Sequence, residues 1–179
     1  MANVVRKMVD GIGVSNKFPK NLKYFNEVSV PEIVTLDYKK PDIKELLSIM
    51  VDTEILSLRV IDTVNGLSSE GQKFDGAKLV VDLKISQKVK YSADEENQSV
   101  HIVNFENIVR GIYIAIPYKL NGTSAYDLLK QNRIIVKSYI EDIFAEKKDE
   151  RTIFKNITIL VNAKFRLFKN NNSTFVDEK

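Results

Sequence analysis

Hydrophobic and polar residues alternate along the stretch from Ala77 to Tyr91, AKLVVDLKISQKVKY. A β-strand points successive side chains to opposite faces, so this alternation predicts a strand with one apolar and one mostly charged face. Gln87 is the one polar residue on the apolar face, which otherwise consists of Leu79, Val81, Leu83, Ile85, Val89 and Tyr91. The other face carries Val80, Asp82, Lys84, Ser86, Lys88 and Lys90. We therefore expect a long antiparallel strand that lies between a core and water.

Five other stretches also have the composition and the apolar pattern of strands. They cover residues 28–36, 48–64, 99–116, 134–143 and 153–168. Pro31 lies in the first stretch, and because proline cannot donate a ladder hydrogen bond, that strand is expected at a sheet edge or with a bulge. In the second stretch the apolar positions change parity near Ile55 and Leu56, which predicts a β-bulge.

Glycine and polar residues mark the turns between these strands. Residues 65–66 and Gly71 predict a loop, and the Asp-Gly pair at residues 75–76 predicts a tight turn into the strand that follows. Residues 94–98, DEENQ, predict a polar turn after that strand. Strands separated by such short connections favour antiparallel neighbours.

Two segments have the signals of short helices. Pro41 to Leu47 begins with a proline suited to a first helical turn and has acidic residues near the positive helix end. Thr123 to Gln131 offers Thr123 or Ser124 as the N-cap.

About six to eight strands with little helix predict an all-β, mainly antiparallel fold. The pattern leaves two architectures open, a two-sheet β-sandwich and a barrel-like module, each with one or two short helices. We expect the β domain to span residues 24–168. Residues 1–23 form an N-terminal arm before it, and residues 169–179 form a polar C-terminal tail.

The N-terminal arm contains apolar residues that Gly11 and Gly13 interrupt. The apolar spacing permits a short amphipathic helix, whereas the two glycines favour extended chain. Two interpretations stay open: the arm packs on its own domain, or it docks on a neighbouring subunit, because an exposed apolar segment favours a partner. The candidate self-association residues are Val4, Val5, Met8, Val9, Ile12 and Val14.

Composition narrows the class of protein. The 179 residues contain no cysteine, which excludes disulfides and cysteine-based zinc sites. The net charge is +3 and the two signs are interspersed, so we expect no nucleic-acid partner. No apolar run approaches the roughly 20 residues that a membrane span needs, and the N-terminus lacks a signal-peptide core. We expect synthesis in the cytoplasm.

The polar residues do not form a recognisable catalytic or metal-binding pattern. His101 is the only histidine, so a multi-histidine metal site is not expected. Glu141 and Asp142 are adjacent and should point to opposite faces of a strand, which favours salt bridges over a paired acid–base site. The acidic turn at residues 94–96 lacks the spacing of a calcium loop. We predict a non-enzymatic protein with no catalytic, cofactor-binding or metal-binding residues and no cofactor.

Basic side chains are expected along one exposed side of the sheet, where lysines commonly prevent edge pairing. They are Arg59, Lys84, Lys88 and Lys90. Binding of an acidic partner is the alternative interpretation of these residues.

Two stretches, Gly66 to Glu106 and Val136 to Phe165, resemble one known family. The matched features are Glu70-Gly71-Gln72, Gly76, Lys78-Leu79, Lys88-Val89, Tyr91, Ser99-Val100-His101, Phe105, Glu141-Asp142, Arg151-Thr152-Ile153 and Lys155-Asn156. In these features the chain resembles the SPOCS domain of spore-forming Firmicutes, over most of residues 24–165. The resemblance implies that the matched residues are structural, with Gly71 and Gly76 in turns and Arg151 pairing with the Glu141-Asp142 carboxylates across a loop.

The resemblance implies a spore-associated role. In a spore morphogenetic protein this domain accompanies a LysM module, but no LysM-like module follows Phe168, so we expect a stand-alone domain. We expect a structural protein of the spore surface, in a coat or exosporium layer or a filament, that self-assembles through β-domain contacts and its N-terminal arm. The expected partners are further copies, as a homo-oligomer or polymer, and other spore coat or exosporium proteins. The alternative is an adaptor that docks a spore morphogenetic protein or a glycan. The resemblance places synthesis in the mother cell and the final location at the spore surface.

Overall fold

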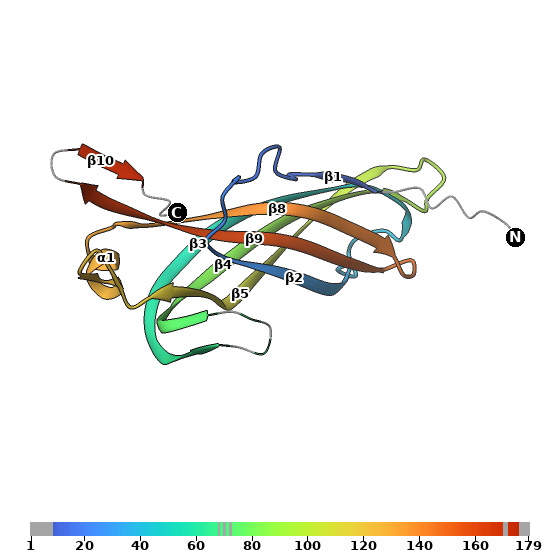
Figure 1. Ribbon diagram of the computed structural model, residues 1–179. Helices are drawn as coiled ribbons and strands as arrows, with labels where there is room; N and C mark the ends of the chain where they lie inside the picture. Colours follow the sequence, from blue (N-terminus) through green and yellow to red (C-terminus); the bar gives the residue numbers. More distant parts are fainter. Residues whose placement is uncertain (1–8, 68, 70, 72, 170–171, 176–179) are drawn as a thin grey trace, which may run out of the picture.

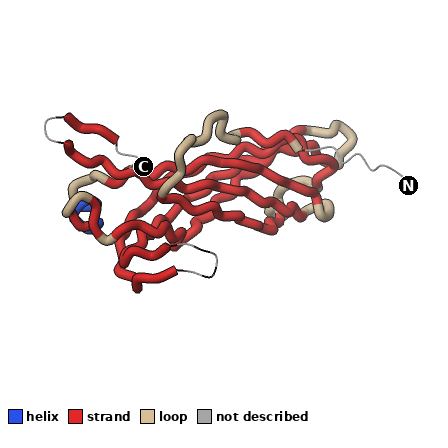
Figure 2. The backbone as a smooth tube through the Cα atoms, viewed as in Figure 1, coloured by secondary structure: helices blue, strands red, loops and turns tan. Residues whose placement is uncertain are grey.

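Two long β-sheets lie face to face in the computed structural model, which describes residues 9–67, 69, 71, 73–169 and 172–175 (Figure 1). The expected fold class is confirmed. The described chain is mostly strand, the main sheets are largely antiparallel, and their ladders do not close into a barrel (Figure 2).

The first sheet has the strand order β1-β3-β4-β5. Its strands are β1 (Asp10–Ile12), β3 (Ile43–Leu67), β4 (Lys73–Ala93) and β5 (Val100–Pro117). β1 pairs parallel with β3, and the longer neighbours pair antiparallel. The apolar face predicted for β4 is confirmed, because its apolar residues from Leu79 to Tyr91 are completely buried. The expectation of a fully solvated second face is wrong at Val80 and Asp82, which are also buried.

The second sheet is built around β9 (Thr152–Lys169), which has β2 (Tyr24–Thr35) on one side and β8 (Ile134–Lys147) on the other. β10 (Asn172–Phe175), within the predicted tail, pairs antiparallel with the end of β9. β2 is an edge strand, as Pro31 predicted.

A short segment closes one end of the molecule between β5 and β8. It contains β6 (Lys119–Leu120), β7 (Thr123–Ser124) and α1 (Ala125–Lys130). The predicted helix here is confirmed, with Ser124 as its N-cap: the Ser124 Oγ accepts a hydrogen bond from the Asp127 backbone N–H at 3.1 Å. Leu128 is completely buried, so α1 contributes to the core between the sheets.

The predicted helix at Pro41 to Leu47 is wrong, because β3 already begins at Ile43. The antiparallel register of β3 shifts between Ile43 and Glu45 and again between Leu46 and Ser48. Each bulge adds one residue, so Ile43, Leu46 and Ile49 are all buried at a spacing of three. Two bulges in a strand thus produce the apolar spacing that is typical of a helix.

The predicted tight turn at residues 75–76 and the loop at residues 65–66 are also wrong. β3 and β4 stay paired as far as Leu67 and Lys73, so these glycines lie inside strands. Gly76 has φ +90° beside a register shift between Asp62 and Asn65. It is therefore a bulge glycine rather than a turn glycine. The bulge expected near Ile55 and Leu56 is confirmed, and residues 94–98 form the predicted turn between β4 and β5.

The two long sides of the sandwich are closed differently. On one side β2 lies next to β5, and the Asn26 side-chain amide donates to the Tyr113 carbonyl oxygen at 2.7 Å. On the other side the short strand β1 lies between β3 and β8. The arm residues of β1 therefore lie at the junction of the two sheets.

Candidate functional site

Residues 9–15 of the N-terminal arm occupy a narrow slot between β3 and β8. Asp10 to Ile12 pair with Ser48 to Met50 of β3. A side chain at Gly11 would place its Cβ 3.2 Å from the Ile143 Cβ of β8. Gly13 has φ +116°, and a Cβ there would lie 2.2 Å from the Val51 carbonyl oxygen. The slot therefore requires glycine at residue 13 and extended chain, as the two glycines predicted.

Ser15 fastens the end of this segment to β8. Its backbone N–H donates to the Ile140 carbonyl oxygen at 2.8 Å, and its Oγ accepts from the Ile140 N–H at 3.0 Å. The chain then crosses the outer face of the second sheet to reach β2 (Figure 1). Phe18 contacts Tyr139 on this face, with 6.3 Å between the ring centroids.

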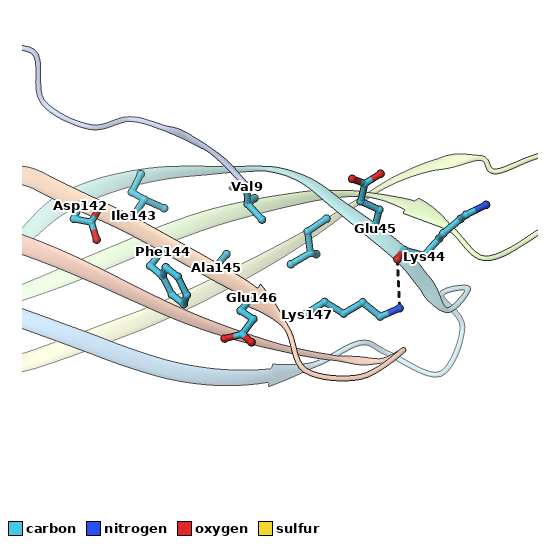
Figure 3. Close-up of a pocket in the computed structure, with 10 residues that line it drawn as sticks. Val9, Lys44, Glu45, Asp142, Ile143, Phe144, Ala145, Glu146 and Lys147 are labelled. Atoms are coloured by element: carbon cyan, nitrogen blue, oxygen red, sulfur yellow. Dashed lines mark hydrogen bonds between the residues drawn. The ribbon is translucent and has the colours of Figure 1, made fainter. Parts of the chain in front are cut away.

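A groove of about 380 Å³ continues the slot toward the start of β3 (Figure 3). Its apolar lining comes from the arm, β3 and β8, with Val9, Leu46, Ile143 and Ala145 among the lining residues. Charged groups form the rim, and the Lys147 ammonium donates to the Ile43 and Lys44 carbonyl oxygens across the groove. The groove is thus an apolar channel with main-chain atoms of β3 at its edge.

Three of the six predicted self-association residues lie in the part of the chain that the structure describes. Val9 is half-buried and packs against the core. Ile12 and Val14 are 41% and 40% exposed. Val4, Val5 and Met8 lie outside the described residues.

A polar layer lies inside the sandwich, where the strand patterns predicted apolar contacts. Gln87 on β4, the interruption noted above, is only 2% exposed. Lys155 on β9 is completely buried, and Glu32 on β2 is its direct neighbour in the ladder. Sequence reasoning missed Glu32 and Lys155 as interior residues. The alternation of side chains along β9 could have shown that Lys155 faces inward, because it lies two residues from Ile153 and two from Ile157, which are both buried.

One oxygen of the Glu32 carboxylate contacts both Gln87 and Lys155. The Glu32 Oε2 accepts from the Gln87 Nε2 at 3.1 Å and lies 3.0 Å from the Lys155 Nζ. The Lys155 ammonium also lies 4.4 Å from the centroid of the Phe105 ring. Burial lowers the pKa of Lys155, and the Glu32 carboxylate opposes part of that effect. The layer therefore holds a buried amine and a buried amide against a carboxyl group whose side chain is 23% exposed.

A second hollow, of about 520 Å³, lies on the outer face of β8 and β9. Its lining is basic and contains Lys137, Lys164 and Arg166, together with Ile135, Tyr139 and Asn162. This arrangement suits an anionic group better than a cation, because no carboxylate lines the hollow.

His101 packs against β4 and contacts the residue that precedes its own strand. Its ring stacks on Tyr91 with 5.7 Å between centroids, and its Nε2 lies 2.9 Å from the Ser99 Oγ. No group of three or more potential metal-ligating side chains occurs among the described residues. Over the same residues, no helix is long and apolar enough to cross a bilayer.

The Glu141-Asp142 pair does not bind Arg151 as the resemblance implied. The Arg151 guanidinium pairs with Asp42 and donates to the Asp37 carbonyl oxygen at 2.7 Å, which ties the turn before β9 to the β2–β3 connection. Glu141 lies at a register shift in β8. Burial and the nearby Glu27 raise the pKa of its carboxyl.

The predicted basic side chains lie on the outer face of the first sheet. Arg59, Lys88 and Lys90 are exposed, and the Lys84 ammonium pairs with Glu106 at 2.9 Å. Their placement is that of a solvated strand face, and they line neither the groove nor the outer hollow.

Comparison with known proteins adds no relative: no family model matches this chain, and neither a curated protein nor a solved structure is similar enough to count as a match. The resemblance to the SPOCS domain therefore stays a prediction.

Proposed function

We propose that this chain is a non-enzymatic structural protein of the bacterial spore surface that self-assembles, with the N-terminal arm as the connector between copies. The observation that carries the proposal is the slot between β3 and β8. It holds the arm through three ladder residues and two glycine contacts. A neighbouring copy carries the same segment and offers the same contacts, so a slot filled within one chain also accepts an arm from another.

The groove extends the contact available to such an arm. It begins at Val9 and runs beside the start of β3, so its apolar lining adds to the surface that an arm contacts. The arm carries the predicted self-association residues Val4, Val5 and Met8, which are apolar. The spore location comes from the family resemblance.

Peptide binding and electron microscopy test this function. We expect the purified full chain to form filaments, layers or large closed particles in negative stain, and deletion of residues 1–13 to abolish them. A peptide of residues 1–15 should then bind the deletion variant in trans, whereas the same peptide with G13A should not, because its Cβ meets the Val51 carbonyl. A monomer at all concentrations that binds no arm peptide would contradict the proposal.

The adaptor function has one observation in its favour, the basic hollow over β8 and β9. In that case an anionic glycan or protein segment would bind there, and K137E with K164E should remove the binding. Deletion of residues 1–13 separates the two functions, because it should abolish assembly and leave an anionic ligand bound.

A further inference from the structure

We propose that the side chains of Lys155 and Gln87 become joined by an intramolecular isopeptide bond between the two sheets, with the Glu32 carboxyl group as the proton carrier. The bond is a modification of the folded monomer. It does not depend on whether the chain assembles.

The register brings the reacting groups into one layer of the sandwich. Lys155 lies opposite Glu32 in the second sheet, and Gln87 lies opposite Phe105 in the first. The amide nitrogen that would leave and the amine nitrogen that would attack both contact the same oxygen, Glu32 Oε2, at 3.1 and 3.0 Å. A single carboxyl group can therefore move protons between them without rearranging the strands.

Gln87 and Lys155 also carry buried polar atoms that lack a hydrogen-bond partner in the described part of the chain. Among the described residues, only Gln87 Oε1 and Lys155 Nζ are buried side-chain polar atoms without a hydrogen-bond partner in the protein. The contact of Lys155 with Glu32 is thus an ion pair rather than an aligned hydrogen bond. A completely buried ammonium carries a large desolvation cost, and an amide bond at Nζ would remove that charge.

The surroundings favour the reaction. Phe105 covers the ammonium, and apolar residues flank each polar group at the neighbouring inward positions: Val30, Val34, Ile85, Val89, Ile153 and Ile157. An apolar, water-poor layer favours the neutral amine, which is the nucleophilic form of lysine. It also keeps water from competing for the amide carbon.

The step is an amide exchange without oxidation or reduction. Glu32 takes a proton from the Lys155 ammonium, and the resulting amine attacks the Gln87 Cδ. A new Nζ–Cδ bond forms, a second proton passes to Nε2, and the Cδ–Nε2 bond breaks. Nε2 leaves as ammonia and takes up the proton held by Glu32. The products are a secondary amide, an ammonium ion and the original carboxylate.

Intact-mass spectrometry of the denatured full-length protein is the direct test. We expect a mass lower than that of the printed sequence by one ammonia. Trypsin should then release a branched species in which Ile85–Lys88 is attached to Thr152–Lys164, because acylated Lys155 is no longer a cleavage site. An unmodified mass would overturn the proposal, and so would loss of one water with a link at Glu32.

Variants assign the roles of the three residues. K155M and Q87M should restore the full mass, and E32Q should slow or abolish the mass loss while keeping a side chain of similar size. K90M is the matched control, because Lys90 lies on the exposed face of the same strand as Gln87. Mass loss that persists in K155M would also contradict the assignment, and the wild-type measurement decides the question if a variant does not fold.

Discussion

At the scale of single residues, the most informative positions are those where a strand pattern is broken. Gln87 breaks the apolar face of β4 and lies in the core, where it bonds to Glu32. Asp82 lies on the opposite face of the same strand, and its carboxylate accepts from the Ser57 Oγ at 2.8 Å and the Gly111 N–H at 3.0 Å. Polar residues at such positions mark contacts between elements rather than solvent exposure.

The carboxyl group of Glu141 gives a prediction at this scale. Its pKa is raised by burial and by Glu27, so the ionised form is disfavoured in the folded protein. That penalty is present above the folded pKa and disappears below the pKa of the unfolded chain. We expect E141Q to raise the thermal midpoint by about 1–2 °C at pH 7, which corresponds to roughly 0.5 kcal/mol from the relieved cost of burying the charge and of its repulsion by Glu27.

Differential scanning fluorimetry at pH 7 and pH 4 measures this effect. The gain should vanish at pH 4, where Glu141 is protonated in the wild type. D142N is the matched control, because Asp142 is the exposed neighbour of Glu141. Equal gains at both values of pH would contradict the electrostatic explanation.

At the scale of elements, β-bulges explain how such long strands keep their apolar faces inward. β3 has four register shifts along its pairing with β4, and β4 has one along its pairing with β5. The Asp82 carboxylate lies where two of them meet, next to the bulge at Ile55 and the bulge that contains Gly111. A bulge leaves backbone groups unpaired, and Asp82 satisfies one of them.

Replacing Asp82 should therefore weaken the first sheet. Hydrogen bonds from Gly111 and Ser57 lower the pKa of this carboxyl, so its stabilisation is complete at neutral pH and is lost as the pH falls through the folded pKa. We expect D82A to lower the thermal midpoint by several degrees at pH 7, and D82N by less, because an amide oxygen still accepts from the Gly111 N–H. The difference between wild type and D82N should narrow as the pH falls below about 4.

Gly13 gives a second prediction at the scale of elements. Its positive φ and the 2.2 Å approach to the Val51 carbonyl leave no room for a Cβ. We expect G13A to cost at least about 1 kcal/mol and to release β1 from β3. Hydrogen exchange at Asp10 to Ile12 should then become fast. G66A is the matched control, because no atom lies within 4 Å of a Cβ at Gly66.

At the scale of the whole molecule, the second sheet joins distant parts of the chain. Tyr24 of β2 pairs with Ala163 of β9, and β9 is the central strand of its sheet. Contacts of such long sequence separation are formed late and slow the folding of β proteins. The sheet that covers one face of the core therefore depends on the C-terminal third of the chain.

Truncation tests that dependence. A chain that ends at Lys147 lacks β9, so β2 and β8 have no common neighbour, and we expect it to be unfolded or aggregated by circular dichroism and size-exclusion chromatography. A chain that ends at Lys169 keeps the full β9 and should fold cooperatively. Native-like thermal unfolding of the shorter chain would contradict this view of the second sheet.

The sequence by itself determined the β class, most of the strands, the capped helix at Ser124, the edge position of Pro31 and the bulge near Leu56. Each of these follows from local chemistry, namely side-chain alternation, proline geometry and capping. The sequence-based predictions were wrong at Pro41 to Leu47 and at Gly76, where the structure has β-bulges. A bulge is an extra residue in one strand relative to its partner, so it cannot be recognised without knowing the partner strand.

Only the tertiary structure decided between a sandwich and a barrel, and only it placed the arm segment from Val9 to Ser15 between β3 and β8. The same is true of the buried layer of Glu32, Gln87 and Lys155. Gln87 is the one polar residue on the apolar face from Leu79 to Tyr91, and Lys155 is the one on the face from Ile153 to Phe165, whereas Glu32 shares its face of β2 with Asn26. Their proximity depends on the register of two sheets and on how the sheets face each other, and no local pattern encodes that arrangement.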